Sequence, residues 1–510
     1  MSGRPASDAI IPGRAAISVG DPKIPLPPGW AWTPLTSIAD LGTGHTPSRK
    51  HPEYWGGDVP WIGIRDAGAH HGGPIHDTQQ QITQLGLENS SARLLPKDTI
   101  CLSRTASVGY VVKMGCDMAT SQDFVTWSST EALDPDYLLK ALLAEGEDIR
   151  RFGEGSTHTT IYFPEVKAFH VALPPVAEQR RIVAKIDSLT GKSRRARDHL
   201  DHIPRLVEKY KQAVLAAAFR GDLTREWRIK NRGSIETAAE TVRRTPAPQQ
   251  SRGGREATTN IKPGVAGLSI NDPGTALPEG WAWTPLRRIT RQETGHTPSR
   301  SKSSYWDGGI PWIGIRDAGL HHGAVIHKTI QTISQEGLAN SSARLLPAGT
   351  VCLSRTASVG YVTIMGRPMA TSQDFATWTC TDALLPEFLM FALLSEGEHI
   401  REFGEGSTHT TIYFPEIRAL HICLAPISEQ REVVGRIRRA LTWIDRLAAE
   451  AISARKLIDR LDQAILAKAF RGELVPQDPS DEPASVLLER IRAEREASPK
   501  ARRGRKGKAA

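Results

Sequence analysis

The sequence is poor in cysteine and has no long apolar run, and each shortage excludes a class of protein. Its five cysteines are odd in number and form no C-x-x-C pair, which argues against a disulfide framework and a cysteine zinc cage. No stretch of about 18 apolar residues occurs, so we expect no membrane-spanning helix. Residues 1–20 are too polar and too interrupted by Gly and Pro for a secretory signal. We therefore expect a globular protein of the reducing cytoplasm.

The net charge of +9 is unevenly distributed along the 510 residues. Two stretches are basic, with net charges of +6 for 178–220 and +4 for 429–471, and the segment 500–508 holds six Lys or Arg and no acid. By contrast, residues 28–177 have a net charge of −6. The basic balance suggests nucleic acid as a partner, whereas the acidic part predicts that this chain alone binds DNA weakly.

An internal repeat dominates the sequence, because adding 251 to a residue number maps 30–221 onto 281–472 without a gap. Whole strings recur, among them Thr43–Arg49 at Thr294–Arg300. This is the duplication of a whole unit and not a short-period solenoid. Recent duplication alone would also explain the identity, but even then both copies should bind the same ligand.

The first part of each repeat is predicted to be a mixed α/β lobe. Short runs broken by Gly, Pro and Asn predict strands at 59–64, 99–103 and 109–112. A helix is predicted over 134–143, with Asp134 as its cap and a proline in its first turn. The fold class we expect is α+β, with two similar lobes joined by two long helices in a pseudo-twofold arrangement.

The second part of each repeat is predicted to be a long helix. Apolar residues alternate by four and three over five heptads in both copies, with Ser193 and Lys468 as the polar exceptions, which predicts an antiparallel coiled coil. Pro204 should kink the first helix. The alternative is that each helix packs only on its own lobe. The residues expected to pack between the helices or against a partner are Ile182, Ile186, Leu189, Leu200, Ile203, Tyr210, Val214, Val433, Ile437, Ile444, Leu447, Ile458, Leu461 and Ile465.

These patterns divide the chain into seven segments. They are a flexible N-terminus (1–27), a first lobe (28–177), a first helical spacer (178–228), a flexible Pro/Gly/Arg-rich linker (229–277), a second lobe (278–428), a second helical spacer (429–475), and a C-terminal helix with a basic tail (476–510). Two like lobes on a rigid spacer suit duplex DNA, because twofold proteins read half-sites about 10 bp apart on one face.

Four short motifs together carry a family resemblance. They are Pro-Pro-Gly-Trp at 27–30, Gly-His-Thr-Pro at 44–47, the string that opens the helix at 173–183, and Ala-Phe-Arg-Gly-Asp-Leu at 218–223. The last two recur in similar form at 424–431 and 469–474. In combination they resemble the DNA-specificity subunit of type I restriction–modification systems, over nearly the whole chain.

The resemblance implies two target-recognition domains separated by helical regions. It further implies an adenine-N6 methyltransferase complex, in which two modification subunits bind the helices and bring S-adenosylmethionine, and it allows a restriction–translocase subunit as a further partner. This chain would supply DNA reading, with no catalytic residue, cofactor or metal of its own. The target base would be flipped into the pocket of a modification subunit.

The sequence motifs argue against catalysis by this chain itself. No Asn-Pro-Pro-Tyr or Asp-Pro-Pro-Tyr string of the adenine methyltransferases is present. The string Thr190–Ser193 resembles the end of a phosphate loop, but Ile186 stands where that motif needs glycine. The histidines near Asp66 lack metal-ligand spacing. Two alternatives stay open, namely a two-lobed metal-dependent nuclease or other hydrolase, and a solitary DNA-reading subunit of another defence enzyme.

Polar strings that recur in both lobes are the candidate DNA contacts. Arginine suits guanine edges and phosphates, and glutamine suits adenine. The alternative for each is a structural role, such as an Arg65–Asp66 pair or threonines that cap turns. The candidates are Thr43, His45, Thr46, Ser48, Arg49, Arg65, Arg104, Gln122, Ser156, Thr157, His158, Thr159 and Thr160, with their copies Thr294, His296, Thr297, Ser299, Arg300, Arg316, Arg355, Gln373, Ser407, Thr408, His409, Thr410 and Thr411.

The near identity of the lobes leads to a sharper hypothesis about the target. Both lobes are expected to read the same short sequence in inverted orientation, so that the site is an interrupted palindrome. With three or four base pairs per half, the gap would be about six or seven base pairs. Differences between the copies, such as those between 50–53 and 301–304, would work against this symmetry.

Overall fold

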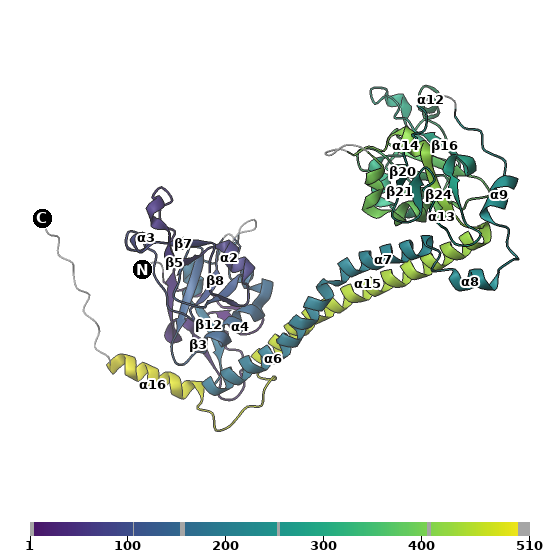
Figure 1. Ribbon diagram of the computed structural model, residues 1–510. Coiled ribbons are helices and arrows are strands. Elements are labelled where there is room, and N and C mark those ends of the chain that lie inside the picture. The colour runs from purple at the N-terminus through teal and green to yellow at the C-terminus, as the bar shows by residue number, and fades with distance from the viewer. Residues whose placement is uncertain (1–4, 106, 154–158, 252–254, 405–409, 498–510) are drawn as a thin grey trace. The chain divides into compact units, whose positions relative to one another are not determined.

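The computed structural model describes residues 5–105, 107–153, 159–251, 255–404 and 410–497 (Figure 1). The chain divides into two units. Unit 1 comprises Met1–Leu200 and Ser453–Ala510, and unit 2 comprises Asp201–Ile452. Each unit therefore combines one lobe with the start of that lobe's own helix and with the end of the helix from the other repeat.

A five-stranded sheet forms the centre of lobe 1. The strand we predicted at 99–103 is found in this sheet, and the one predicted at 109–112 begins two residues later. The strand predicted at 59–64 lies in a neighbouring sheet, where it begins four residues earlier and ends two residues sooner than predicted. The order of the five-stranded sheet is β4 (Ala39–Thr43), β11 (Phe124–Ser129), β8 (Ile100–Ser103), β9 (Val111–Met114) and β6 (Pro74–Ile75). Gly109 has a positive φ of 112°, a turn conformation that delays the start of the strand.

Two smaller sheets complete lobe 1. One is an antiparallel sheet of β1 (Ile11–Pro12), β2 (Ile17–Val19), β12 (Phe169–Leu173) and β3 (Ala31–Pro34). The other consists of β10 (Ala119–Thr120), β5 (Trp55–Ile62) and β7 (Gln80–Ile82). Because β1 and β2 lie within residues 1–27, our prediction of a flexible N-terminus is wrong for these residues.

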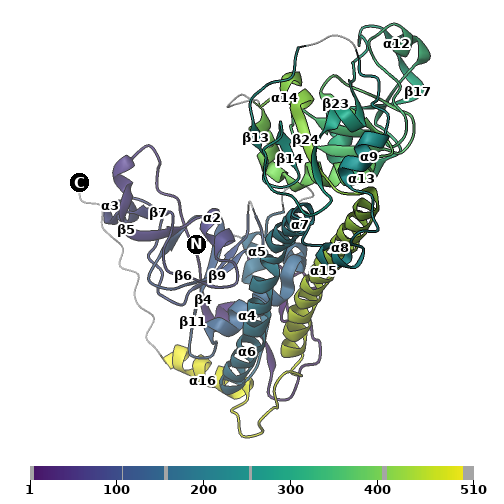
Figure 2. The same ribbon diagram turned by 45° about the vertical axis from the view of Figure 1, so that its right-hand side comes forward.

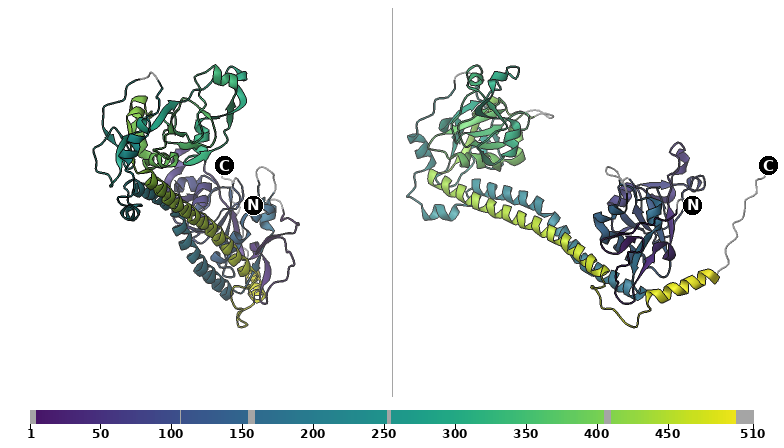
Figure 3. Two further views of the ribbon diagram at one scale, coloured as in Figure 1. Left: turned by 90° about the vertical axis from the view of Figure 1, so that its right-hand side faces the viewer. Right: turned by 180° about the vertical axis from the view of Figure 1, so that it is seen from behind.

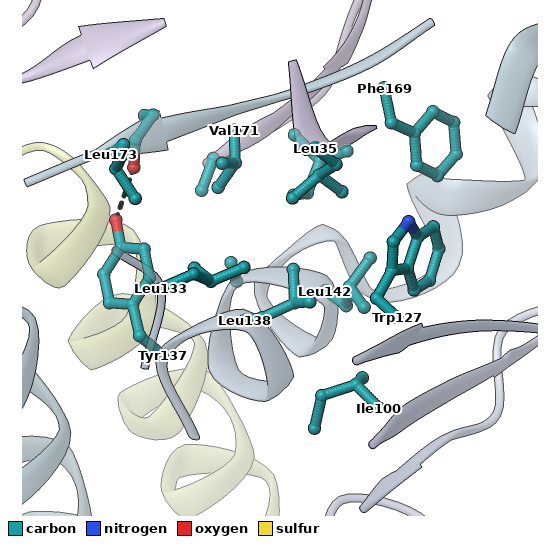
Figure 4. Close-up of a cluster of buried hydrophobic side chains, with 14 of the residues drawn as sticks. Leu35, Ile100, Trp127, Leu133, Tyr137, Leu138, Leu142, Phe169, Val171 and Leu173 are labelled. Atoms are coloured by element: carbon teal, nitrogen blue, oxygen red, sulfur yellow. Dashed lines mark hydrogen bonds between the residues drawn. The ribbon is translucent and has the colours of Figure 1, made fainter. Parts of the chain in front are cut away.

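The main core of lobe 1 lies against helix α4 (Pro135–Glu145) (Figure 4). As predicted, Asp134 caps this helix, and its carboxylate accepts hydrogen bonds from the backbone N–H groups of Asp136 and Tyr137. The Tyr137 hydroxyl donates to the carbonyl of Ala172 over 2.6 Å, so the buried phenol is satisfied. Trp127 stacks on Phe169 at 6.0 Å between ring centroids. The aromatic pair therefore joins the two larger sheets, and the Tyr137 hydrogen bond joins α4 to β12.

Short helices connect these strands and form the edges of the lobe. Each spans between three and seven residues, so it serves to turn the chain rather than to build a layer. They are α1 (Leu35–Ile38), η1 (Pro52–Tyr54), α2 (Ile64–Ala69), α3 (Gln84–Glu88), η2 (Gly146–Phe152) and α5 (Phe163–Lys167).

Lobe 2, in unit 2, repeats this topology strand for strand (Figure 2). Its three sheets have the orders β16-β23-β20-β21-β18, β13-β14-β24-β15 and β19-β17-β22. The strands are β13 (Lys262–Pro263), β14 (Leu268–Ile270), β15 (Ala282–Pro285), β16 (Thr290–Thr294), β17 (Trp306–Ile313), β18 (Ala324–Ile326), β19 (Gln331–Ile333), β20 (Val351–Ser354), β21 (Val362–Met365), β22 (Ala370–Thr371), β23 (Phe375–Cys380) and β24 (Leu420–Leu424). The helices are α10 (Leu286–Ile289), η3 (Ser303–Tyr305), α11 (Ile315–Leu320), α12 (Gln335–Ala339), α13 (Pro386–Ser395), η4 (Gly397–Phe403) and α14 (Phe414–Ala419).

The segment 229–277, which we predicted to be a flexible linker, packs in part on lobe 2. It holds the end of α8 (Arg225–Lys230), all of α9 (Ala238–Arg244), and the hairpin of β13 and β14. The buried carboxylate of Glu396 fixes this hairpin, because it accepts the backbone N–H groups of Val265 (2.7 Å) and Leu268 (2.9 Å). Glu145 does the same for the hairpin of lobe 1. The polar composition concealed these strands, since they are only two or three residues long.

In unit 1 the helix α6 (Val176–Asp201) packs on the second half of α15 (Ile427–Phe470). Arg197, near the end of α6, pairs with Asp459 (2.8 Å) and Asp462 (2.7 Å). Ile182, near its start, belongs to the same core cluster as Ile465. Later residues of one helix thus meet earlier residues of the other, which confirms the antiparallel pairing.

In unit 2 the helix α7 (Ile203–Phe219) packs on the first half of α15 in the same sense (Figure 3). Lys211 pairs with Asp445 at 2.7 Å, and Phe219 shares a core cluster with Val433. Helix α16 (Ala484–Ala497) returns to lobe 1, where Leu487 and Ile491 are buried. The predicted C-terminal helix is therefore confirmed.

The first helix is interrupted close to Pro204, as predicted. Helix α6 ends at Asp201 and α7 begins at Ile203, with Pro204 in its first turn. Proline has no N–H to continue the helical ladder. At the equivalent position the second repeat has Arg455, and α15 runs through it without a break over 44 residues.

Eleven of the fourteen residues expected to pack between the helices or against a partner are buried or half-buried. Six of the expected packing residues are buried, namely Ile182, Ile186, Val433, Ile437, Ile444 and Ile465, and five are half-buried, namely Leu189, Leu200, Ile203, Val214 and Ile458. Tyr210, Leu447 and Leu461 are 61%, 41% and 54% exposed, so they do not pack between the helices, and packing against a partner stays a prediction for these three. Two helices cover only one stripe of each other, so the remaining apolar positions of a wide pattern face outward.

Candidate DNA-recognition surfaces

The Thr-Gly-His-Thr-Pro string lies directly against strand β10 in lobe 1. Gly44 makes this possible, because a Cβ atom there would lie 2.0 Å from the carbonyl oxygen of Thr120. The N–H of His45 donates to that same oxygen over 2.9 Å. In lobe 2, Gly295 and Thr371 show the same 2.0 Å approach. The glycine of this motif is therefore required by close backbone packing, and His45 is held through its backbone.

The close packing brings two predicted contacts together. Thr46 Oγ1 donates to Gln122 Oε1 over 2.6 Å, and Thr297 Oγ1 donates to Gln373 Oε1 over the same distance. Gln122 and Gln373 are themselves exposed. The threonine fixes the amide plane, so that the two Nε2–H donors of each glutamine are presented to solvent in a defined orientation.

An oriented arginine lies beside each of these glutamines. Arg104 Nη2 donates to the carbonyl of Gln122 (3.2 Å), and Arg355 Nη2 donates to that of Gln373 (3.0 Å). Each guanidinium lies over a ring, Phe163 at 4.7 Å in lobe 1 and its counterpart at 4.5 Å in lobe 2. Burial lowers the pKa of both arginines, and a nearby aspartate opposes this shift. A charged, partly desolvated and pre-oriented arginine is suited to a phosphate or a guanine edge.

The arginines at the end of the same string stack on tryptophan. Arg49 lies 4.4 Å from the ring centroid of Trp55 and donates to Gln80 Oε1 over 2.9 Å. Arg300 lies 5.0 Å from the ring of Trp306. Both arginines are exposed, as are Ser48 and Ser299. Stacking holds the exposed guanidinium groups in place without neutralising their charge.

Arg65 and Arg316 are exposed, and the alternative of an Arg65–Asp66 pair is not what the structure shows. Asp66 is buried and accepts the backbone N–H groups of Gly63 and Gln79, each over 2.9 Å. In lobe 2 four predicted contacts, from three separate parts of the sequence, line one cleft of about 500 Å³. These four are Thr297, Arg300, Arg316 and Gln373.

Some predicted contacts have structural roles or lie outside the described residues. Thr43 Oγ1 donates to the carbonyl of Phe124 (2.7 Å), and Thr294 Oγ1 does the same to Phe375 (2.9 Å), so both hydroxyls are used within the fold. Ser156, Thr157, His158, Ser407, Thr408 and His409 lie outside the described residues. The flanking Thr159, Thr160, Thr410 and Thr411 are half-buried.

Sequence reasoning missed the residues that support these contacts. Asp123 accepts from Thr105 Oγ1 (2.5 Å) and from Ser121 Oγ (3.0 Å), and Asp374 holds the corresponding hydroxyls in lobe 2. Trp55 and Gln80, which position Arg49, were also missed. Each of these residues recurs at the offset of 251, so the repeat itself contained the signal.

Neither a metal-binding cluster nor a membrane-spanning helix is found among the described residues. No group of three or more His, Cys, Asp or Glu side chains in the described part of the chain is arranged to hold a metal ion. Among the helices described, none is long and apolar enough to cross a membrane.

Comparison with known proteins identifies the class. The family model for the type I restriction modification DNA specificity domain matches twice, at residues 27–199 and 278–447. The chain therefore belongs to this family, and it is a specificity subunit of a type I restriction–modification system, whose role is DNA sequence recognition. The comparisons favour this function over the nuclease and over the solitary reader that the sequence left open.

Similar proteins include two curated specificity subunits from Escherichia coli. That of the type I restriction enzyme EcoDI is 25% identical over 404 residues, which cover 74% of this chain and 81% of the relative. That of EcoKI, from strain K12, is 22% identical over 504 residues, which cover 93% and 97%. Both repeats of this chain thus have counterparts in a protein of similar length.

Solved structures confirm the two-lobed fold with long helices. The HsdS subunit from Thermoanaerobacter tengcongensis matches with a TM-score of 0.56 at 21% identity, over 88% of this chain and 99% of that one. A chain from a structure of the complex assembly and conformational transition of a type I R-M system matches with a TM-score of 0.62 at 20% identity, over 88% and 100%. At such low identity the likeness concerns the fold alone.

Proposed function

We propose that each lobe reads one half of a bipartite DNA site, and that the two half-sites have the same sequence in inverted orientation. The observation that carries this proposal is the repeated geometry around one glutamine in each lobe. The distance from the threonine hydroxyl to the amide is 2.6 Å in both lobes, and the arginine lies on the glutamine carbonyl at 3.2 and 3.0 Å. Surfaces with the same donors in the same orientation select the same base edges.

The chain supplies the reading, and partner subunits supply the catalysis. Two modification subunits would bind the helices, bring S-adenosylmethionine and methylate the N6 position of adenine, with a restriction–translocase subunit as a further partner in the cytoplasm. Exposed apolar side chains on the helices support a binding role for them. In unit 2 these are Leu206, Tyr210, Trp443, Leu447 and Ile452, and in unit 1 Leu457 and Leu461.

The charge distribution supports weak binding of DNA by the isolated chain. Phosphate neutralisation contributes much of the affinity of proteins for DNA, and residues 28–177 have a net charge of −6. The partners would complete a basic channel around the duplex. The proposal is tested by a gel shift of the isolated chain and of the chain co-purified with a modification subunit, on a duplex that carries the site and on one that does not. Tighter and more selective binding by the complex supports it, and equal binding by the isolated chain contradicts it.

A further inference from the structure

Lobe 2 has a second cleft, which adjoins the candidate recognition surface. Its volume is about 770 Å³, and its lining includes Gln373, which also lines the first cleft of this lobe. His296 and Arg355, two of the predicted DNA contacts, line it as well. The second cleft is therefore continuous with the surface proposed to read DNA.

This second cleft is strongly basic. Its lining includes Arg255, Arg287, Arg344, Arg355 and Arg418. Glu293 is the one acidic residue in that lining, with its side chain 4% exposed. Its carboxylate already accepts from Arg344 Nη1 (2.7 Å) and from Arg291 Nη2 (3.0 Å). Arg287 is half-buried, and among the described residues we find no hydrogen bond or ion pair for its guanidinium.

The segment between the repeats helps to build this cleft. Gln250 Nε2 donates to the carbonyls of Arg287 and Thr290, each over 2.8 Å, and Gln250 Oε1 accepts the N–H of Gln292 (3.2 Å). Ser251 Oγ accepts from Arg344 Nη1 over 2.9 Å. The backbone beside Arg287 is thus fixed, and the arginine is held at the cleft by a segment that its sequence marks as a linker.

Lobe 1 repeats this charge only in part: Arg93, Arg104 and Lys167 correspond to Arg344, Arg355 and Arg418, but Thr36 stands in place of Arg287. In α10 and β16 of lobe 2 the four positions 287, 288, 291 and 293 hold three arginines and one glutamate. At the offset of 251, α1 and β4 of lobe 1 hold Thr36, Ser37, Asp40 and Gly42, which is one acid and no base. The lobes therefore share their candidate reading residues but differ in the charge beside them.

We propose that this cleft binds a phosphate of the DNA backbone, with Arg287 as the principal contact, so that lobe 2 holds the duplex more tightly than lobe 1. The proposal rests on the DNA-reading function described above. Duplex DNA and free nucleotides both carry phosphate groups that such a cleft could bind. We assign the cleft to a phosphate of duplex DNA next to a half-site. Such a contact adds affinity for any sequence and carries no base preference. The two lobes would then differ in their affinity for DNA although they read the same half-site.

The test measures how the affinity for DNA depends on salt. Binding of the full chain to a labelled 30-bp duplex of unrelated sequence, and to its target duplex, is followed by fluorescence anisotropy between about 0.05 and 0.2 M salt. The variants are Arg287→Thr, which installs the residue of lobe 1, and Arg287→Lys, which keeps the charge. Arg244→Thr is the matched control, since it removes an exposed arginine of α9 that pairs with Glu236 at 2.8 Å.

Loss of one phosphate contact lowers the slope of log K against log salt by about 0.9, and at 0.1 M salt the affinity falls about eightfold. We expect this for Arg287→Thr on both duplexes, with little change for Arg287→Lys or for the control. An unchanged slope for Arg287→Thr overturns the proposal. A loss of affinity for the target duplex alone, with unchanged affinity for the unrelated duplex, also overturns it.

Two further results distinguish failure of the phosphate-binding proposal from failure of the DNA-reading function on which it rests. ATP binding that Arg287→Thr abolishes, together with an unchanged DNA slope, would assign the cleft to a free nucleotide and overturn the assignment to DNA. If the unaltered chain shows no preference for any duplex even in complex with a modification subunit, the proposed function fails, whereas the slope on the unrelated duplex still decides whether the cleft binds a phosphate.

Discussion

Arg228 Nε lies 3.0 Å from Oε1 of Glu429, a residue 201 positions later in the sequence. Thr224 Oγ1 donates to the same oxygen over 2.6 Å, and Trp281 Nε1 donates to Oε2 over 2.9 Å. The end of the first repeat's helical segment is thereby locked to the base of lobe 2. The counterpart Glu178 accepts from Trp30 over 3.1 Å, but its Oε1 is buried without a partner among the described residues, and burial raises its pKa.

The network around Glu429 predicts that Arg228→Ala destabilises unit 2. The change leaves a carboxylate that is only 1% exposed without its cation, and the removal of one partner of a buried pair costs about 3 kcal/mol. Urea unfolding measures the loss. Arg225→Ala is the control, because Arg225 pairs with Asp222 at the surface, and we expect a change of less than about 0.5 kcal/mol. Equal stability of the two variants would refute the role assigned to Arg228.

The Thr46–Gln122 hydrogen bond predicts an effect on specificity. Thr46→Val removes the hydroxyl that fixes the amide, and Thr297→Val does so in lobe 2. We expect each variant to lose about tenfold in discrimination between the target and a one-base mismatch in the affected half-site, consistent with about 1–3 kcal/mol for a good base contact. Competition binding with mismatched duplexes measures this, and unaltered discrimination in both variants would show that the threonines do not orient a reading residue.

Gly44 predicts a local packing defect. A methyl group at this position meets the Thr120 carbonyl oxygen at 2.0 Å, so Gly44→Ala must displace the string that carries His45 and Thr46. We expect a loss of DNA binding and a destabilisation of about 1–3 kcal/mol or more. The matched control is Gly191→Ala in α6, where nothing lies within 4 Å, and the helix should gain about 0.5–1 kcal/mol. Binding by Gly44→Ala at the level of the unaltered chain would contradict the packing role of this glycine.

Two equivalent histidines predict a dependence of stability on pH. Burial lowers the pKa of His71, and Nδ1 accepts the N–H of Val111 over 3.1 Å, which requires a neutral nitrogen. His322 accepts from Val362 in the same way, and burial lowers its pKa although Glu208 opposes the shift.

Both histidines have a folded-state pKa below the unfolded value of about 6.5. The stability that each neutral ring contributes to the folded protein is therefore present above pH 6.5 and is lost as the pH falls below it. Asparagine also offers an acceptor oxygen but does not titrate. We therefore expect the double variant His71→Asn/His322→Asn to lose less thermal stability than the unaltered chain between pH 7 and 5. An equal fall in Tm for both proteins would show that these rings do not contribute.

The sequence predicted the elements whose signals are local or repeated. Asp134 before a proline and an apolar run specified the start of α4, and the heptads specified the buried faces of α6 and α15. The offset of 251 marked Thr46 and Gln122 as candidate contacts, because both recur. That these two residues, 76 positions apart, form a hydrogen bond depends on strand packing, which no local pattern encodes.

Other features could not be predicted from the sequence, and the reasons are physical. Strands β13 and β14 are too short for a recognisable alternation, and they are held by Glu396, more than 120 positions away. Periodicity identified the apolar face that carries Tyr210 but not how far the neighbouring helix covers it. Glu293 received no attention because it differs from its counterpart Gly42, and only the structure shows that it pairs with Arg344.

Methylation mapping tests the central claim most directly, namely that the two lobes read the same half-site. Single-molecule sequencing of host DNA, with the gene for this chain present and deleted, reports N6-methyladenine at every site. We predict one bipartite motif whose halves are inverted copies, separated by about six or seven base pairs, and modified only when the chain is present. A bipartite motif with two unrelated halves would contradict the equivalence of the lobes.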